Sequence, residues 1–187
     1  MDIFLHSLLL VGIGEIGDKT QLLAMVLACR YRKPVAILTA IFLATLLNHA
    51  VAAWVGEVIG SKLDGIWMQW VIALSFIGIG FWVLKPDTLD EKESKGDYGA
   101  FLTTLILFFL AEIGDKTQIV TIALAAEYKA LIPVLLGTTA GMLLVNMPAV
   151  FCGNWIMKTL PVHYIRYAAS LLFIGFGFLL ICRITAP

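Results

Sequence analysis

The sequence predicts an all-α membrane protein with six transmembrane helices, arranged as two inverted three-helix repeats. Of its 187 residues, 60% are hydrophobic and only 14% are charged, a composition far more apolar than that of soluble globular domains. The apolar residues form six segments long enough to cross a bilayer core about 30 Å thick. These segments span residues 3–29, 34–60, 66–85, 100–126, 130–157 and 164–183.

A seven-residue motif in the first segment returns unchanged in the fourth. The two copies are Glu15-Ile16-Gly17-Asp18-Lys19-Thr20-Gln21 and Glu112-Ile113-Gly114-Asp115-Lys116-Thr117-Gln118. Each copy places three ionisable residues between two charge-free runs. The other segments repeat as well, because Phe76–Phe81 resembles Phe173–Phe178 and Asn48 is echoed by Asn146.

The repeats divide the chain into 1–85, a charged cytoplasmic linker at 86–99, and 100–187. Three helices per repeat is an odd number, so the second repeat must enter the membrane from the opposite side, an arrangement found in many transporters. The second and fifth segments also carry Gly56-x-x-x-Gly60 and Gly137-x-x-x-Gly141. We expect these glycines to pack helices closely, with a hinge as the alternative.

The charges between the segments predict the orientation. With the N-terminus outside, the inner connections would hold eight lysines and arginines and the outer ones three. The inner set is Arg30, Arg32, Lys33, Lys85, Lys92, Lys95, Lys158 and Arg166, and the outer set is Lys62, Lys129 and Arg183. The positive-inside rule therefore predicts that both termini are outside.

The composition also excludes several classes of function. The formal net charge is zero, so no basic surface is expected to bind nucleic acid. The three cysteines are isolated, which gives neither a disulfide framework nor a CxxC metal site. The expected partners are therefore the lipid bilayer and small ions, and the oligomeric state stays open, a homo-oligomer included.

The repeated motif predicts a polar site in the middle of the membrane. On a continuous helix, Glu15 and Asp18 are three residues apart and share a face. A charge at mid-bilayer costs about 3 kcal/mol, so these side chains must face each other or a polar cavity. One alternative is a pair of structural ion pairs, Glu15–Lys19 and Glu112–Lys116. This alternative leaves Asp18 and Asp115 over, and buried ion pairs contribute little to stability by themselves.

The other alternative is a divalent cation site. Each motif carries two carboxylates and one charge-balancing lysine, Lys19 or Lys116, so the two motifs together carry a charge of −2. Carboxylate and amide oxygens are hard donors that suit Mn²⁺, Ca²⁺ or Mg²⁺. The predicted metal ligands are Glu15, Asp18, Glu112, Asp115, Gln21, Gln118, Asn48 and Asn146. Hydrogen bonding between helices is the alternative role for the two asparagines.

Other residues near the motifs have two interpretations each. Gly14, Gly17 and Gly114 would let the helices kink or break and would free backbone carbonyls. Thr20 and Thr117 would bond to that backbone or line the ion pathway. His49 has no counterpart in the second repeat, where Met147 follows Asn146; it would make a core hydrogen bond or relay protons.

Carboxylates that bind a metal ion can bind protons instead, so the site could exchange one divalent ion for protons. The sequence thus predicts a cation/proton antiporter that is not an enzyme and has no prosthetic group. A passive divalent cation channel is the alternative. An intramembrane aspartyl protease with Asp18 and Asp115 as its dyad is disfavoured, because the lysine after each aspartate favours two ionised carboxylates rather than one shared proton.

At these residues the chain resembles the cation/proton exchanger family that has two copies of Glu-Φ-Gly-Asp-(Lys/Arg)-(Thr/Ser), where Φ is hydrophobic. The family includes bacterial manganese exporters and Golgi manganese and calcium transporters. The resemblance covers essentially the whole chain, and both motifs fit. It implies six helices in inverted repeats, with Glu15, Asp18, Glu112 and Asp115 binding the cation. For a short bacterial-type chain, it implies Mn²⁺ efflux across the inner membrane, with Ca²⁺ as the alternative ion.

Overall fold

The computed structural model describes residues 3–62, 65–85, 98–152 and 162–186. The predicted linker at 86–99 lies outside these residues, except for its last two. The end of the fifth predicted segment, at 153–157, also lies outside them. The described residues form helices joined by short connections and contain no strand. The helices are α1 (Ile3–Glu15), α2 (Lys19–Tyr31), α3 (Pro34–Lys62), α4 (Ile66–Val83), α5 (Ala100–Glu112), α6 (Lys116–Tyr128), α7 (Leu131–Cys152) and α9 (Val162–Thr185).

Four of these helices are long and apolar enough to cross a membrane, namely α3, α4, α7 and α9. Helices α1 and α5 are apolar but have only 13 residues each. They form the first halves of the first and fourth predicted segments, and α2 and α6 form the second halves. These findings confirm the prediction of an all-helical membrane protein. The prediction that Glu15 and Asp18 lie on one continuous helix is wrong, because each motif interrupts its helix.

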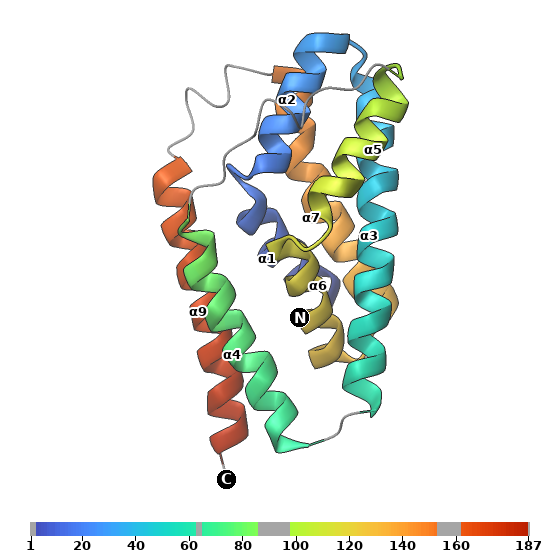
Figure 1. Cartoon of the computed structure of the whole chain (residues 1–187). Coiled ribbons are helices and arrows are strands. Elements are labelled where there is room, and N and C mark those ends of the chain that lie inside the picture. The colour runs from blue at the N-terminus through green and yellow to red at the C-terminus, as the bar shows by residue number, and fades with distance from the viewer. Residues whose placement is uncertain (1–2, 63–64, 86–97, 153–161, 187) are drawn as a thin grey trace.

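The helices pack mainly against helices of the other repeat (Figure 1). Helix α1 lies against α7, while α3 contacts α5, α6 and α7. Helices α4 and α9 form a pair along one side of the bundle. Followed along the colour bar, α1 and α2 run upward in Figure 1 while α5 and α6 run downward, and α4 and α9 also run in opposite directions.

Glycines form the closest contacts between the repeats. A Cβ atom added to Gly56 of α3 would lie 2.2 Å from the carbonyl oxygen of Ile122 in α6. One added to Gly137 of α7 would lie 2.4 Å from the carbonyl oxygen of Phe4 in α1. The structure therefore confirms that these glycines pack helices, since a larger residue would separate the backbones.

Aromatic rings pack α4 against α9, and one of them also reaches α1. Phe76 and Phe173 are both buried, and their rings stack with centroids 6.4 Å apart. A Cβ atom added to Gly14 would lie 3.1 Å from the Phe173 ring. The kink or break expected at Gly14 is wrong, because Gly14 lies within α1, where its small size admits this ring one residue before the first motif.

Candidate metal centre

The two motifs form matching breaks in the middle of the bundle. At the first, Gly17 has a φ of 81° and Asp18 caps the N-terminus of α2, with its Oδ1 accepting the Lys19 N–H at 2.7 Å. At the second, Gly114 has a φ of 74° and Asp115 precedes α6. Positive φ values are easily reached only by glycine. The Gly-Asp step of the motif therefore ends one helix and starts the next.

The glutamines of the motifs hold these turns. Gln21 Oε1 accepts a hydrogen bond from Gly17 N–H at 2.8 Å, and Gln118 Oε1 accepts one from Gly114 N–H at 2.8 Å. Gln21 Nε2 also donates to the carbonyl oxygen of Val145 in α7 at 3.1 Å. The side-chain oxygens of Gln21 and Gln118 were predicted to bind a cation. In the structure they accept backbone hydrogen bonds and so stabilise the two helix breaks.

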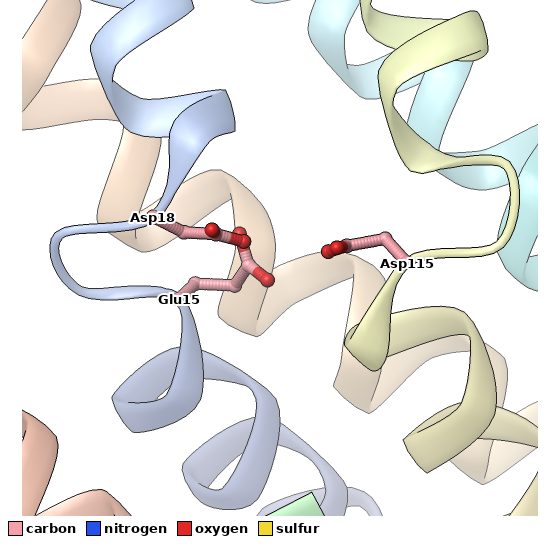
Figure 2. A group of neighbouring side chains, drawn as sticks. All are labelled: Glu15, Asp18 and Asp115. Carbon is pink, nitrogen blue, oxygen red and sulfur yellow. The ribbon is translucent and has the colours of Figure 1, made fainter. Parts of the chain in front are cut away.

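Three carboxylates from the two motifs converge between the breaks (Figure 2). Glu15, Asp18 and Asp115 each offer one oxygen, and these oxygens lie within 4.8 Å of one another. All three side chains are buried, and so is the fourth acid, Glu112, at the end of α5. Residues almost 100 positions apart in the sequence therefore form one acidic cluster.

Two ion pairs join the motifs crosswise. Lys116 Nζ lies 2.9 Å from Asp18 Oδ1, and Lys19 Nζ lies 3.3 Å from Asp115 Oδ1. The two pairs are not equivalent, because the Lys116 side chain is 5% exposed and the Lys19 side chain is 26% exposed. Each lysine thus balances an aspartate of the other repeat, a pairing that its position in the sequence does not reveal.

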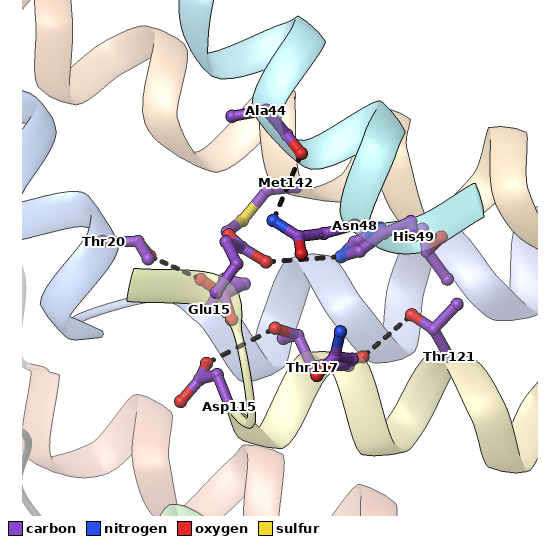
Figure 3. Close-up of polar contacts among 12 residues, drawn as sticks. Glu15, Thr20, Ala44, Asn48, His49, Asp115, Thr117, Thr121 and Met142 are labelled. Carbon is purple, nitrogen blue, oxygen red and sulfur yellow. Dashed lines mark hydrogen bonds and ion pairs between the residues drawn. The ribbon is translucent and has the colours of Figure 1, made fainter. Parts of the chain in front are cut away.

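Threonine hydroxyls orient two of the acids (Figure 3). Thr20 Oγ1 donates to Glu15 Oε2 at 2.8 Å, and Thr117 Oγ1 donates to Asp115 Oδ2 at 3.4 Å. From the sequence, these hydroxyls were expected to bond to the backbone or to line an ion pathway; in the structure they donate to the carboxylates of their own motifs.

The amide nitrogen of Asn48 joins two helices, whereas that of Asn146 bonds within its own helix α7. Asn48 Nδ2 donates to the carbonyl oxygen of Phe109 in α5 at 3.1 Å, and Asn146 Nδ2 donates to that of Met142 one turn earlier at 3.0 Å. Figure 3 shows Asn48 next to His49. Among the described residues, the buried Asn146 Oδ1 has no hydrogen-bond donor.

Several buried carboxylate oxygens are likewise unsatisfied. Within the described parts of the chain, no donor reaches Glu15 Oε1 or either side-chain oxygen of Glu112. A buried polar atom without a partner costs about 1–3 kcal/mol, and more when it is charged. The arrangement therefore suits a bound cation, which would satisfy these oxygens.

Sequence reasoning missed a contact from α9. Arg166 Nη2 donates to the carbonyl oxygen of Gly17 at 3.2 Å. Arg166 was expected only to mark the inner side of the membrane. It lies 149 residues from Gly17 in the sequence, so no local sequence pattern predicts this contact. This contact ties α9 to the break in the first motif.

The chain is similar to known proteins over almost its whole length. Residues 3–91 and 100–186 match the family described as "Divalent cation/proton antiporter GDT1". The chain is 49% identical over 175 residues to a protein of Vibrio cholerae described as "Putative manganese exporter", a match that covers 93% of this chain and 88% of that protein.

More distant relatives come from plants. GDT1-like protein 4 of Oryza sativa subsp. indica is 27% identical over 202 residues, covering 94% of this chain and 72% of its own length. GDT1-like protein 3 of Arabidopsis thaliana is 27% identical over 205 residues, covering 94% and 69%. No solved structure matches the chain. The chain therefore belongs to the GDT1 family, whose members are divalent cation/proton antiporters rather than enzymes.

Proposed function

We propose that this protein exports Mn²⁺ from the cytoplasm in exchange for protons, through the buried carboxylates of the two motifs. The observation that carries the proposal is the convergence of Glu15, Asp18 and Asp115, whose oxygens lie within 4.8 Å of one another inside the bundle. Glu112 completes the set of four acids. With Lys19 and Lys116 as balancing charges, the ionised site has a charge of −2, which one divalent cation neutralises.

The ligand set favours a hard or borderline divalent ion. Carboxylate oxygens suit Mg²⁺, Ca²⁺ and Mn²⁺, and Asn146 Oδ1 adds an amide oxygen without a donor among the described residues. The description of the Vibrio cholerae relative as a manganese exporter favours Mn²⁺. Ca²⁺ is the competing ion. Protons return on the same carboxylates after the metal ion has left, which couples the two fluxes.

The architecture proposed for this cycle has six membrane passes in two inverted repeats, 1–85 and 100–187, joined by a cytoplasmic linker at 86–99. The opposite directions of the matching helices in Figure 1 support this arrangement. Both termini face the periplasm and the chain lies in a bacterial inner membrane. In support, Arg32 and Lys33 lie between α2 and α3 at one end of the bundle, while Lys129 and Arg183 line one pocket with Gly60 at the far end of α3.

The experiment is a flux measurement in proteoliposomes that contain the purified protein and a pH-sensitive dye. We expect an Mn²⁺ gradient to drive Mn²⁺ across the membrane and to move protons in the opposite direction. Asp18→Asn and Asp115→Asn should each abolish both fluxes, because each removes a carboxylate from the cluster. Glu57→Gln is the matched control, because Glu57 lies outside the motifs and accepts the Leu131 N–H at 3.3 Å, which glutamine can also accept.

The outcomes separate the alternatives. Mn²⁺ flux that moves no protons would identify a passive channel. Ca²⁺ flux in place of Mn²⁺ flux would identify a calcium exchanger. Full exchange by both aspartate variants, with native helix content by circular dichroism, would refute the proposed site.

A further inference from the structure

A histidine borders the acidic cluster without being part of either motif. His49 lies on α3, and both it and Glu112 are fully buried. Its Nε2 lies 3.5 Å from Glu112 Oε2, and its Nδ1 lies 3.0 Å from the hydroxyl of Thr138 in α7. Figure 3 shows His49 beside Asn48.

The hydrogen bonds of Thr138 relate to the protonation of His49. A hydroxyl has only one hydrogen to donate, and the Thr138 hydroxyl has two partners, the carbonyl oxygen of Leu135 at 3.2 Å and His49 Nδ1 at 3.0 Å. When it donates to Leu135, it accepts from His49, and the imidazole proton is on Nδ1. In this neutral tautomer, Nε2 has a lone pair that faces Glu112.

The contact between His49 and Glu112 then joins two acceptors. Among the described residues, no hydrogen-bond donor reaches His49 Nε2 or either oxygen of Glu112. A buried lone pair opposite a carboxylate oxygen is unfavourable unless a cation lies between them. Two atoms that bind one ion at about 2.0–2.6 Å can be as far apart as about 5 Å, and the observed 3.5 Å lies within this limit.

We propose that His49 Nε2 is a metal ligand that acts with Glu112 to select Mn²⁺ over Ca²⁺. The inference rests on the proposed function of the same site. Ca²⁺ takes oxygen ligands, whereas Mn²⁺ is suited by carboxylates but belongs to the first-row divalent metals that nitrogen ligands also bind. A nitrogen ligand therefore adds more to the affinity for Mn²⁺ than to that for Ca²⁺.

The selectivity would come from one side of the site only. The residue after Asn146 in the second repeat is Met147, and Met147 is 38% exposed. The two motifs thus supply matched carboxylates, and the first repeat alone supplies the nitrogen.

Pulsed electron paramagnetic resonance of Mn²⁺ bound to the purified protein tests the inference. A directly bound imidazole gives a ¹⁴N modulation of the Mn²⁺ echo, which a histidine with a purely structural role does not. We expect this modulation in the wild type and in His6→Gln, and its loss in His49→Gln. His6 is the matched control because it is a half-buried histidine whose Nδ1 bonds to the Tyr128 hydroxyl at 3.1 Å.

Competition between the two ions gives the second readout. In His49→Gln, the ratio of Mn²⁺ to Ca²⁺ affinity should fall by at least about tenfold, in line with the loss of groups that support a metal site. An equal fall for both ions would indicate a structural role and overturn the inference. If His49→Gln does not fold, the wild-type spectrum decides, since Mn²⁺ bound without ¹⁴N modulation refutes the ligand. Failure of the wild type to bind Mn²⁺ would instead refute the proposed function.

Discussion

The close contact of α3 with α6 makes the substitution Gly56→Ala a sensitive test of the fold. The new Cβ atom would lie 2.2 Å from the carbonyl oxygen of Ile122, whereas ordinary contacts begin at 3.4 Å. The two backbones would therefore have to separate by about 1 Å, and no flexible side chain can absorb the shift. Overpacking costs about 1–3 kcal/mol, and we expect the upper end because backbone must move. Alanine recovers about 1 kcal/mol in helix propensity, which leaves a net loss of about 2 kcal/mol.

Gly78→Ala in α4 is the matched control, because a Cβ atom there meets nothing within 4 Å. It should stabilise the protein by up to about 1 kcal/mol through helix propensity alone. Thermal unfolding in detergent, followed by circular dichroism, should show a lower Tm for Gly56→Ala and an unchanged or higher Tm for Gly78→Ala. If both variants shift the Tm equally, the contact between α3 and α6 does not have the geometry described.

Two further predictions concern the motifs. Lys116→Met should lower the free energy of unfolding by about 3–5 kcal/mol, because it removes the buried counter-ion 2.9 Å from Asp18; Lys19→Met should cost less, because that side chain is 26% exposed and water screens its charge. Equal losses in denaturation experiments on the two variants would contradict this asymmetry. Arg166→Met should slow Mn²⁺ flux in proteoliposomes severalfold, because it removes the donor to the Gly17 carbonyl, and Arg166→Lys should restore part of the rate; an unchanged rate in Arg166→Met would exclude a role for this contact in transport.

Much of the fold follows from local properties of the sequence. Apolar segments predicted helices at 34–60 and 66–85, close to the observed Pro34–Lys62 and Ile66–Val83. A kink or break was expected at Gly17 and Gly114, where the structure has turns, but the mean hydropathy of the first and fourth segments gave no sign of these turns because it averages over many residues. A turn at Gly17 depends on one positive φ value and on the hydrogen bond from the Gly17 N–H to the Gln21 side chain. Neither changes the mean hydropathy of the segment.

The acidic residues of the candidate site could be predicted from the sequence, but the ion pairs between its lysines and aspartates could not. Unpaired charges are costly in a membrane, so Asp18 and Asp115 had to converge on a polar site. Which lysine faces which aspartate depends on the packing of the two repeats, and the sequence gives no register between them. Packing also decided the partner of His49, since Thr138 lies 89 residues away.

The interlocking of the two repeats has a consequence for biosynthesis. Helix α3 packs against α5, α6 and α7, all of which follow it in the chain. Between the end of α3 at Lys62 and the start of α6 at Lys116, the ribosome needs roughly 3–10 s at about 5–20 residues per second. During this interval the surface of α3 that carries Gly56 and Gly60, and that later contacts α6, faces lipid or the insertion machinery. Folding is therefore completed only after the second repeat has been inserted. Either repeat expressed alone would leave exposed the helix surface that normally packs against the other repeat.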